Sequence, residues 1–236
     1  MTMEIDLIIE NKLQEAFDIS ELKKRLPKED FERIIKAEQK IIFKKGDVLF
    51  GSEERSKGVY VVEKGMIKLS KLGVFGKEQI LRFIKEGDLI GYRSLLCSEN
   101  LKAKAEAMTD VETTFIPADI FLYLVERDSK LSYALLQKFA YELGESSNRI
   151  TLLAQKTVRE RLAEIFLILE RRLGKDAEGY INITLTREEI ANLIGTATES
   201  AIRLISEFKN DNLISVDGRN IKIINHDKLM KLGNCC

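Results

Sequence analysis

Short runs rich in apolar residues, separated by glycines, occupy the first half of the chain. The runs include Val59–Val62, Ile67–Ser70, in which apolar and polar residues alternate, and Gln79–Ile84, and eight of the 14 glycines fall between residues 46 and 91. Alternation is typical of half-buried strands, and glycines at such intervals mark the turns between them. The pattern predicts a compact antiparallel β domain over residues 38–116, preceded by two short helices within Ile19–Ala37 that are broken at Pro27.

After Pro117 the hydrophobic period becomes helical, and a single helix is predicted from Ser129 to about Gln155. Within it Leu136, Leu143 and Ile150 recur every seven residues, with Phe139, Ser146 and Leu153 beside them. This spacing is typical of a seam between two helices. The helix could instead pack on its own β domain, but at about 1.5 Å per residue it outreaches a small domain. A dimer seam formed by Leu136, Leu143, Ile150 and Leu153 is therefore expected.

The last third of the chain predicts a winged helix-turn-helix. Thr157-Val-Arg-Glu160 and Thr186-Arg-Glu-Glu189 are capping boxes, the first starting a helix that ends at Gly174 and placing a hinge at residues 154–157. Tyr180–Leu185 is expected to be a short strand. Apolar positions on both sides of Gly195 predict two helices that cross at a tight turn, the second over Thr198–Asn210. A hairpin with an Asp217-Gly218 turn follows them.

The second helix of this pair carries the residues expected to read DNA. Leu204, Ile205 and Phe208 should pack inward, which leaves Thr198, Glu199, Ile202 and Arg203 facing a major groove. Arg203 can donate hydrogen bonds to guanine, and Glu199 can accept one from cytosine. Glu199 could instead form a capping box with Thr196 at the start of the helix. Arg187 and Arg219 are expected to contact phosphates, and Thr186 completes the predicted DNA-binding set.

Composition narrows the function classes. The 236 residues carry 38 Lys and Arg against 38 Asp and Glu, which argues against a non-specific nucleic-acid coat. No apolar stretch approaches the roughly 18 residues of a membrane helix, and the acidic start does not predict a secretory signal. Three cysteines, Cys97, Cys235 and Cys236, indicate a reducing cytoplasm. With His226 as the one histidine, no nucleophile–base pair, zinc site or other metal site is expected, so an enzyme is disfavoured.

These features together resemble the CRP/FNR superfamily of bacterial transcription regulators. The resemblance covers about residues 20–232, and its most specific parts are the helix-turn-helix and Gly87-Asp-Leu-Ile-Gly91. It implies an α+β fold: an effector-sensing β-roll of jelly-roll type (residues 1–128), a dimerisation helix with a hinge (129–156) and a winged helix-turn-helix (157–236). It also implies a homodimer on a palindromic operator, with RNA polymerase as a partner and no membrane association.

The effector itself does not follow from the resemblance. Cyclic-AMP-binding members carry an acid and an Arg-Ser pair after this glycine motif, whereas Tyr92 and Lys102-Ala103 stand at those positions here. Lysine lacks the planar fork of arginine, so cyclic AMP is not expected. The cysteine cluster of the iron–sulfur members is missing, so no such cluster is expected either. Another small molecule, or no ligand, remains open. The expected pocket residues are Gly91, Tyr92, Arg93, Ser94, Lys102, Ser146 and Ser147.

A second function class stays open at this stage. The chain could be a cyclic-nucleotide-type sensor module that controls a partner protein. The segment Thr186–Ser206 separates the two hypotheses, because a signalling subunit has no use for an exposed helix that reads a DNA groove.

Overall fold

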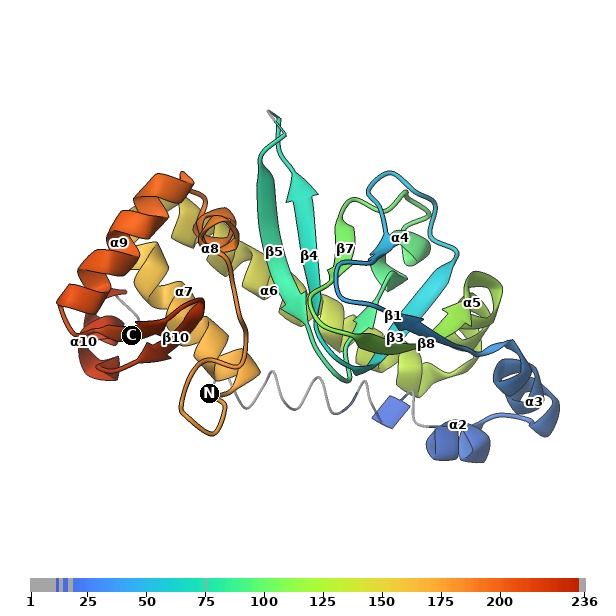
Figure 1. Cartoon of the computed structure of the whole chain (residues 1–236). Helices are drawn as coiled ribbons and strands as arrows, with labels where there is room; N and C mark the ends of the chain where they lie inside the picture. Colours follow the sequence, from blue (N-terminus) through green and yellow to red (C-terminus); the bar gives the residue numbers. More distant parts are fainter. Residues whose placement is uncertain (1–11, 13–14, 17–18, 75, 234–236) are drawn as a thin grey trace. The chain divides into compact units, whose positions relative to one another are not determined.

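The computed structural model describes the chain except for residues 1–11, 13–14, 17–18, 75 and 234–236 (Figure 1). Its contacts divide the chain into two units, one of residues 1–72 and 81–144 and the other of residues 73–80 and 145–236. The expected α+β fold is confirmed, with antiparallel sheets in the first unit and a helix-turn-helix in the second.

The first unit is a β-roll of two four-stranded antiparallel sheets, with strand orders β1-β8-β3-β6 and β2-β7-β4-β5. The two sheets enclose a core that includes Val62, Ile67 and Val111. The strands are β1 (Gln39–Phe43), β2 (Val48–Phe50), β3 (Gly58–Lys64), β4 (Ile67–Leu72), β5 (Glu78–Ile84), β6 (Leu89–Ile90), β7 (Lys104–Ala107) and β8 (Val111–Pro117). Gly73 and Gly76 lie in the turn between β4 and β5, as the glycine pattern predicted.

Helices pack on the outer side of the β3–β8 sheet and form a second core. Its members include Val59, Phe121, Leu124 and Leu131, all buried. The helices of this layer are α2 (Ile19–Arg25), α3 (Lys28–Ala37), α4 (Tyr92–Leu96), α5 (Ala118–Arg127) and the first part of α6 (Ser129–Gln155). The predicted break at Pro27 is confirmed, since this residue is the N-cap of α3.

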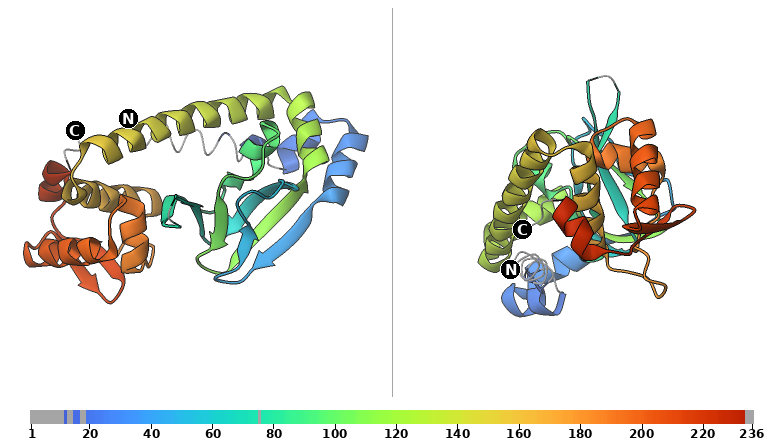
Figure 2. Two further views of the ribbon diagram at one scale, coloured as in Figure 1. Left: turned by 90° about the horizontal axis from the view of Figure 1, so that it is seen from above. Right: turned by 90° about the vertical axis from the view of Figure 1, so that its left-hand side faces the viewer.

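The helix α6 is one unbroken element of 27 residues (Figure 2). One expectation about it is wrong. The heptad pattern predicts Phe139 beside Leu136 and Leu143 in a seam between two helices, but its ring packs 5.3 Å from that of Tyr92 and against the helical core of the β-roll. The a/d spacing is the same for a seam between two helices and for a helix that packs on its own domain. In α6, one side packs on the β-roll through residues such as Phe139, and another side carries the exposed seam residues.

The second unit contains α7 (Val158–Leu173), α8 (Arg187–Ile194), α9 (Thr198–Asn210), the hairpin β9 (Ile214–Asp217) and β10 (Asn220–Ile223), and α10 (His226–Leu232). The predicted bounds of α7 and α9 are confirmed.

The predicted strand over Tyr180–Leu185 is wrong. An isolated bridge joins Ile181 to Lys175, and the carboxylate of Asp176 accepts hydrogen bonds from the amides of Glu178 and Tyr180, which folds the chain into a loop. Ile181 and Leu185 are nevertheless buried. The apolar positions of this segment therefore indicate that two side chains are buried, and the segment does not pair with another strand through a ladder of backbone hydrogen bonds.

Candidate DNA-binding surface

The helix-turn-helix forms because both of its helices have well-defined ends. Thr186 accepts a hydrogen bond from the amide of Glu189, whose side chain accepts one from the amide of Thr186, so the predicted capping box is confirmed. Gly195 ends α8 with φ 65° and ψ 54°, a left-handed conformation that favours glycine. The chain can therefore turn sharply and begin α9 at Thr198.

The two helices are held together by small and branched apolar residues. Ala191 and Ala201 are fully buried where the helices meet, as is Ile194. On α9, Leu204, Ile205 and Phe208 face the interior, as the sequence predicted. Burial of this face fixes which side of α9 is left for a ligand.

The opposite face of α9 is open. Glu199, Ile202 and Arg203 are exposed, and Thr198 is half-buried. The Arg203 side chain is 73% exposed, with its Nε 3.9 Å from Oε1 of Glu207 one turn further along. Such a pair of exposed charges is weak, so the guanidinium can reorient toward another acceptor at little cost.

The alternative capping role of Glu199 is wrong. The N-cap of α9 is Ala197, which makes no side-chain cap hydrogen bond, so Thr196 lies one residue too early to form the box. Glu199 is thus an exposed residue of the first turn of α9. An acid at this position also suits the positive end of the helix dipole.

Arg159 anchors the rear of α9, a role that sequence reasoning missed. Its Nη1 donates to Oε2 of Glu207 at 2.7 Å and its Nη2 to Oδ2 of Asp211 at 2.8 Å. The guanidinium also lies over the ring of Phe208, 5.1 Å from the centroid. These contacts tie α7 to α9 across about fifty positions of sequence, and no local pattern signals them.

The wing is the hairpin β9–β10, in which Asp217 pairs with Asn220 and Gly218 takes φ 56°. Arg219 is exposed at its tip. Arg187 is in a different position: Nη2 donates 3.0 Å to the carbonyl of Gly218, and Nη1 is buried without a partner in the part of the chain described. Burial lowers the pKa of Arg187 from its usual value. Arg187 therefore holds the wing turn against the first turn of α8.

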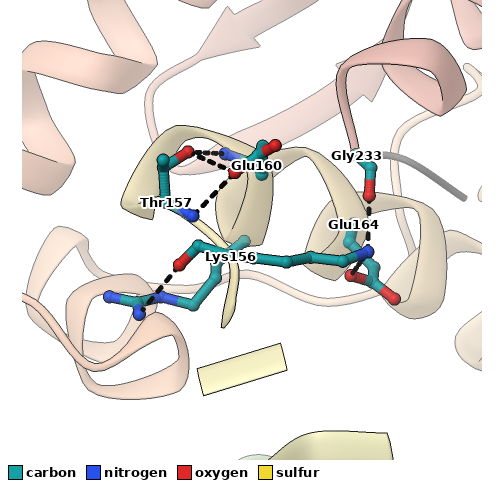
Figure 3. A network of polar contacts seen from close by, with 6 residues as sticks. Lys156, Thr157, Glu160, Glu164 and Gly233 are labelled. Carbon is teal, nitrogen blue, oxygen red and sulfur yellow. Dashed lines mark hydrogen bonds and ion pairs between the residues drawn. The ribbon is translucent and has the colours of Figure 1, made fainter. Parts of the chain in front are cut away.

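The break between α6 and α7 falls within residues 154–157, the segment for which a hinge is predicted, and side chains on both sides of the break make polar contacts (Figure 3). Lys156 Nζ donates to Oε2 of Glu164 at 2.7 Å and to the carbonyl of Gly233 at 2.6 Å. Thr157 and Glu160 form the expected capping box.

Arg161 extends this network toward the helix-turn-helix. It donates to the carbonyls of Leu153 and Gly195, at 3.1 and 3.3 Å. The last carbonyls of α6 and the turn before α9 thus share one guanidinium. Cations are favourable at helix C-termini, where carbonyls lack partners within the helix.

The expected pocket residues of the β-roll fall into different environments. Tyr92 and Ser94 are buried in α4, behind Gly91, which has φ 92°. Arg93 and Lys102 are exposed and pair with Glu99 at 3.7 Å and Glu53 at 3.5 Å, respectively. Ser146 and Ser147 are exposed residues of α6 that belong to the other unit.

The seam residues of α6 are apolar and exposed. Leu136, Leu143 and Ile150 are 63%, 70% and 68% exposed, and Leu153 is 42% exposed. Tyr133, one turn before Leu136, is exposed as well and was missed. A regular row of exposed large apolar side chains on one helix marks a protein-interaction face.

The remaining candidate residues have structural roles or lie outside the described chain. His226 is the first residue of α10, and its Nε2 lies 2.7 Å from Oε2 of Glu170 on α7. Cys97 is exposed and unpaired, and Cys235 and Cys236 lie outside the described residues. Across the described part of the chain, no group of three or more His, Cys, Asp or Glu side chains could hold a metal. No helix there could span a bilayer.

Comparison with known proteins gives matches for both units. Residues 40–128 match the cyclic nucleotide-binding domain, and residues 160–232 match the Crp-like helix-turn-helix domain. The chain is 30% identical over 199 residues to the fumarate and nitrate reduction regulatory protein of Vibrio cholerae, covering 83% of this chain and 78% of that one. It is likewise 30% identical over 196 residues to electron transport regulator A of Shewanella oneidensis, covering 81% and 77%.

Solved structures of transcription regulators also superpose on this chain. FixK2 from Bradyrhizobium japonicum superposes with a TM-score of 0.73 at 25% identity, covering 83% of this chain and 96% of that one. A CRP/FNR-family transcriptional regulator from Thermus thermophilus superposes with a TM-score of 0.70 at 26% identity, covering 83% and 98%.

Proposed function

Because the chain belongs to the CRP/FNR superfamily of transcription regulators, we propose that it acts as a homodimer on an inverted-repeat operator. It is a DNA-binding regulator and not an enzyme, and its helix-turn-helix domain favours this function over that of a sensor module for a partner protein. The observation that carries the proposal is the open face of α9, which presents Glu199, Ile202 and Arg203 directly after a tight turn.

The exposed face of α9 enters the major groove. Arg203 donates two hydrogen bonds to guanine O6 and N7, and Glu199 accepts one from cytosine N4. Thr198 and Ile202 complete the surface that lies against the bases. Thr186 and Arg187 at the start of α8, and Arg219 at the tip of the wing, face the phosphates.

The homodimer forms through the exposed row of Leu136, Leu143, Ile150 and Leu153. Pairing α6 with a second copy removes these side chains from water. Each Å² of apolar surface that is buried contributes about 25 cal/mol of favourable free energy to dimer formation. Two-fold symmetry then presents two copies of α9 to two successive turns of DNA.

The proposed partners follow from the same function. A regulator bound beside a promoter acts on RNA polymerase, in the cytoplasm where bacterial DNA is found. Gly91, Tyr92, Arg93, Ser94, Lys102, Ser146 and Ser147 remain the proposed surroundings of any diffusible effector, and their chemistry does not suit cyclic AMP.

Selection from a random DNA library with the purified full-length chain tests the proposal. The enriched sequence should be an inverted repeat whose half-site centres lie about 10–10.5 base pairs apart. A chain that is folded and dimeric yet enriches no sequence would contradict it. Enrichment of a single, unrepeated half-site would retain DNA binding and reject the dimer.

A further inference from the structure

The β-roll matches a cyclic nucleotide-binding domain, and Tyr92, one of its expected pocket residues, already has a hydrogen-bond partner within the chain. Tyr92 stands where nucleotide-binding members carry an acid, and it is only 1% exposed. Its hydroxyl donates a 2.6 Å hydrogen bond to Oε1 of Glu142 on α6. The Tyr92 side chain, which was expected to face a ligand, is therefore hydrogen-bonded to α6 instead.

Arg82 on β5 contacts the same carboxylate. Its Nη1 donates to Oε1 of Glu142, so one oxygen accepts from both Arg82 and Tyr92. Burial and the nearby Glu142 raise the pKa of the Tyr92 hydroxyl, which keeps it a hydrogen-bond donor. Glu142 is thus an anion held by one cation and one hydroxyl, the kind of contacts that a bound carboxylate or phosphate would make.

A second ion pair lies one turn earlier on α6. Lys138 Nζ is 3.7 Å from Oδ1 of Asp88, and the two side chains are only 4% and 6% exposed. Residues four apart on a helix share a face, so Lys138 and Glu142 both point into the β-roll. Each contributes a charge that burial would make costly without its partner.

We propose that Glu142 is a built-in substitute for a small anionic effector, which joins α6 to β5 and α4 without a diffusible ligand. Its partner Tyr92 stands, by the family resemblance, where nucleotide-binding members carry a ligand-binding acid, and Arg82 supplies the cation beside it. The inference rests on the proposed DNA-binding function. It implies that the ligand-free chain binds its operator, and that the cationic site can accept a small carboxylate once Glu142 is removed.

Chemical rescue tests this assignment. Glu142→Ala removes the carboxylate and leaves room beside Arg82, whose side chain is 23% exposed and so within reach of acetate. Operator affinity is measured with chloride and then with acetate at the same ionic strength. The wild-type chain is first unfolded and refolded to remove any ligand, and its mass is checked under native conditions.

Ligand-stripped wild type should bind the selected operator at full affinity, with no response to acetate. Glu142→Ala should lose about tenfold in affinity, within the usual range of coupling between sites, and acetate should restore most of it. Glu145→Ala, on the same helix, is the matched control and should behave as wild type. Glu142→Gln keeps the volume of the side chain and should lose affinity without responding to acetate.

Hydrogen exchange provides a readout that does not depend on DNA. Amides of α4 and β5 should lose protection in Glu142→Ala and regain it with acetate. The proposal is overturned if folded Glu142→Ala keeps its protection and affinity, or if acetate restores neither. It is also overturned if stripped wild type binds only after a small molecule is returned. Rescue of protection in a chain that selects no DNA would instead reject the proposed function.

Discussion

Arg187 Nη2 donates a 3.0 Å hydrogen bond to the carbonyl oxygen of Gly218, which joins the first turn of α8 to the turn of the wing. The two residues are 31 positions apart. Gly218 has a positive φ of 56°, so its carbonyl direction depends on a backbone conformation that glycine favours. Arg187 thus connects the two parts of the DNA-binding surface that are proposed to contact the phosphates.

The first prediction distinguishes Arg187, which is linked to the wing besides facing the phosphates, from Arg219, which is proposed to make a phosphate contact alone. Arg187→Ala should weaken DNA binding and also raise hydrogen exchange in β9 and β10, because the wing loses its link to α8. Arg219→Ala should leave exchange unchanged and lower the slope of log affinity against log salt by about one unit per lost phosphate contact. Titrations at several salt concentrations, with exchange measured on the free proteins, test both. Unchanged wing protection in Arg187→Ala would contradict the positioning role.

The second prediction concerns base readout by Arg203. Arg203→Ala should cost about 1–3 kcal/mol per half-site and relax specificity at one base pair only. Arg203→Lys is the matched control, because it keeps the charge but loses the planar fork, and it should lose the base preference as well. Binding to the preferred site and its single-base variants measures both effects. Equal weakening on every sequence would show that Arg203 contacts phosphate instead.

Features set by neighbours in the chain could be predicted from the sequence. Thr157 and Thr186 start helices through hydroxyls that act three residues away, and Gly174 and Gly195 end them. Such signals need no tertiary information. The bounds of α7 and α9 follow directly from them.

Features set by distant partners could not be predicted. The tertiary fold alone brings Arg159 into contact with Glu207. In the same way it brings Glu142 into contact with Arg82 and Tyr92. The error at Phe139 has the same origin, because a heptad pattern does not say which partner each position meets. At Glu199 a local motif was present, but the helix began one residue later than the motif requires.

The third prediction concerns assembly. Leu143→Glu places a charge in the proposed seam, where a second copy would bury it without a partner, so the protein should become monomeric. Asn148→Glu adds the same charge to an exposed position outside the heptad seam and should stay dimeric. Analytical ultracentrifugation, with circular dichroism to check folding, distinguishes the two. A folded Leu143→Glu protein that remains a dimer would place the interface elsewhere.

The fourth prediction concerns cyclic AMP. Because the Tyr92 hydroxyl is bound to Glu142 and Lys102 pairs with Glu53, millimolar cyclic AMP should change neither the melting temperature nor the operator affinity. A ligand at a hundredfold excess over its Kd stabilises by about 2.7 kcal/mol, which a thermal scan detects readily. A saturable rise in melting temperature would show that the nucleotide can displace the internal contacts.

The fifth prediction is a pH dependence of stability. Burial alone would raise the pKa of the Glu142 carboxyl, but Arg82, the Tyr92 hydroxyl and Lys138 together hold its pKa below the ordinary value. A carboxyl with a lower pKa in the folded chain stabilises it above the unfolded pKa, about 4.3 for Glu, and that contribution fades as the pH falls through the folded value. Urea unfolding of wild type and Glu142→Gln should therefore differ most near neutral pH and converge in acid. The other carboxyls are common to both proteins, so their contributions cancel in the difference. A difference in the free energy of unfolding that stays constant with pH would contradict an ionised Glu142, on which the proposed substitute for an anionic effector depends.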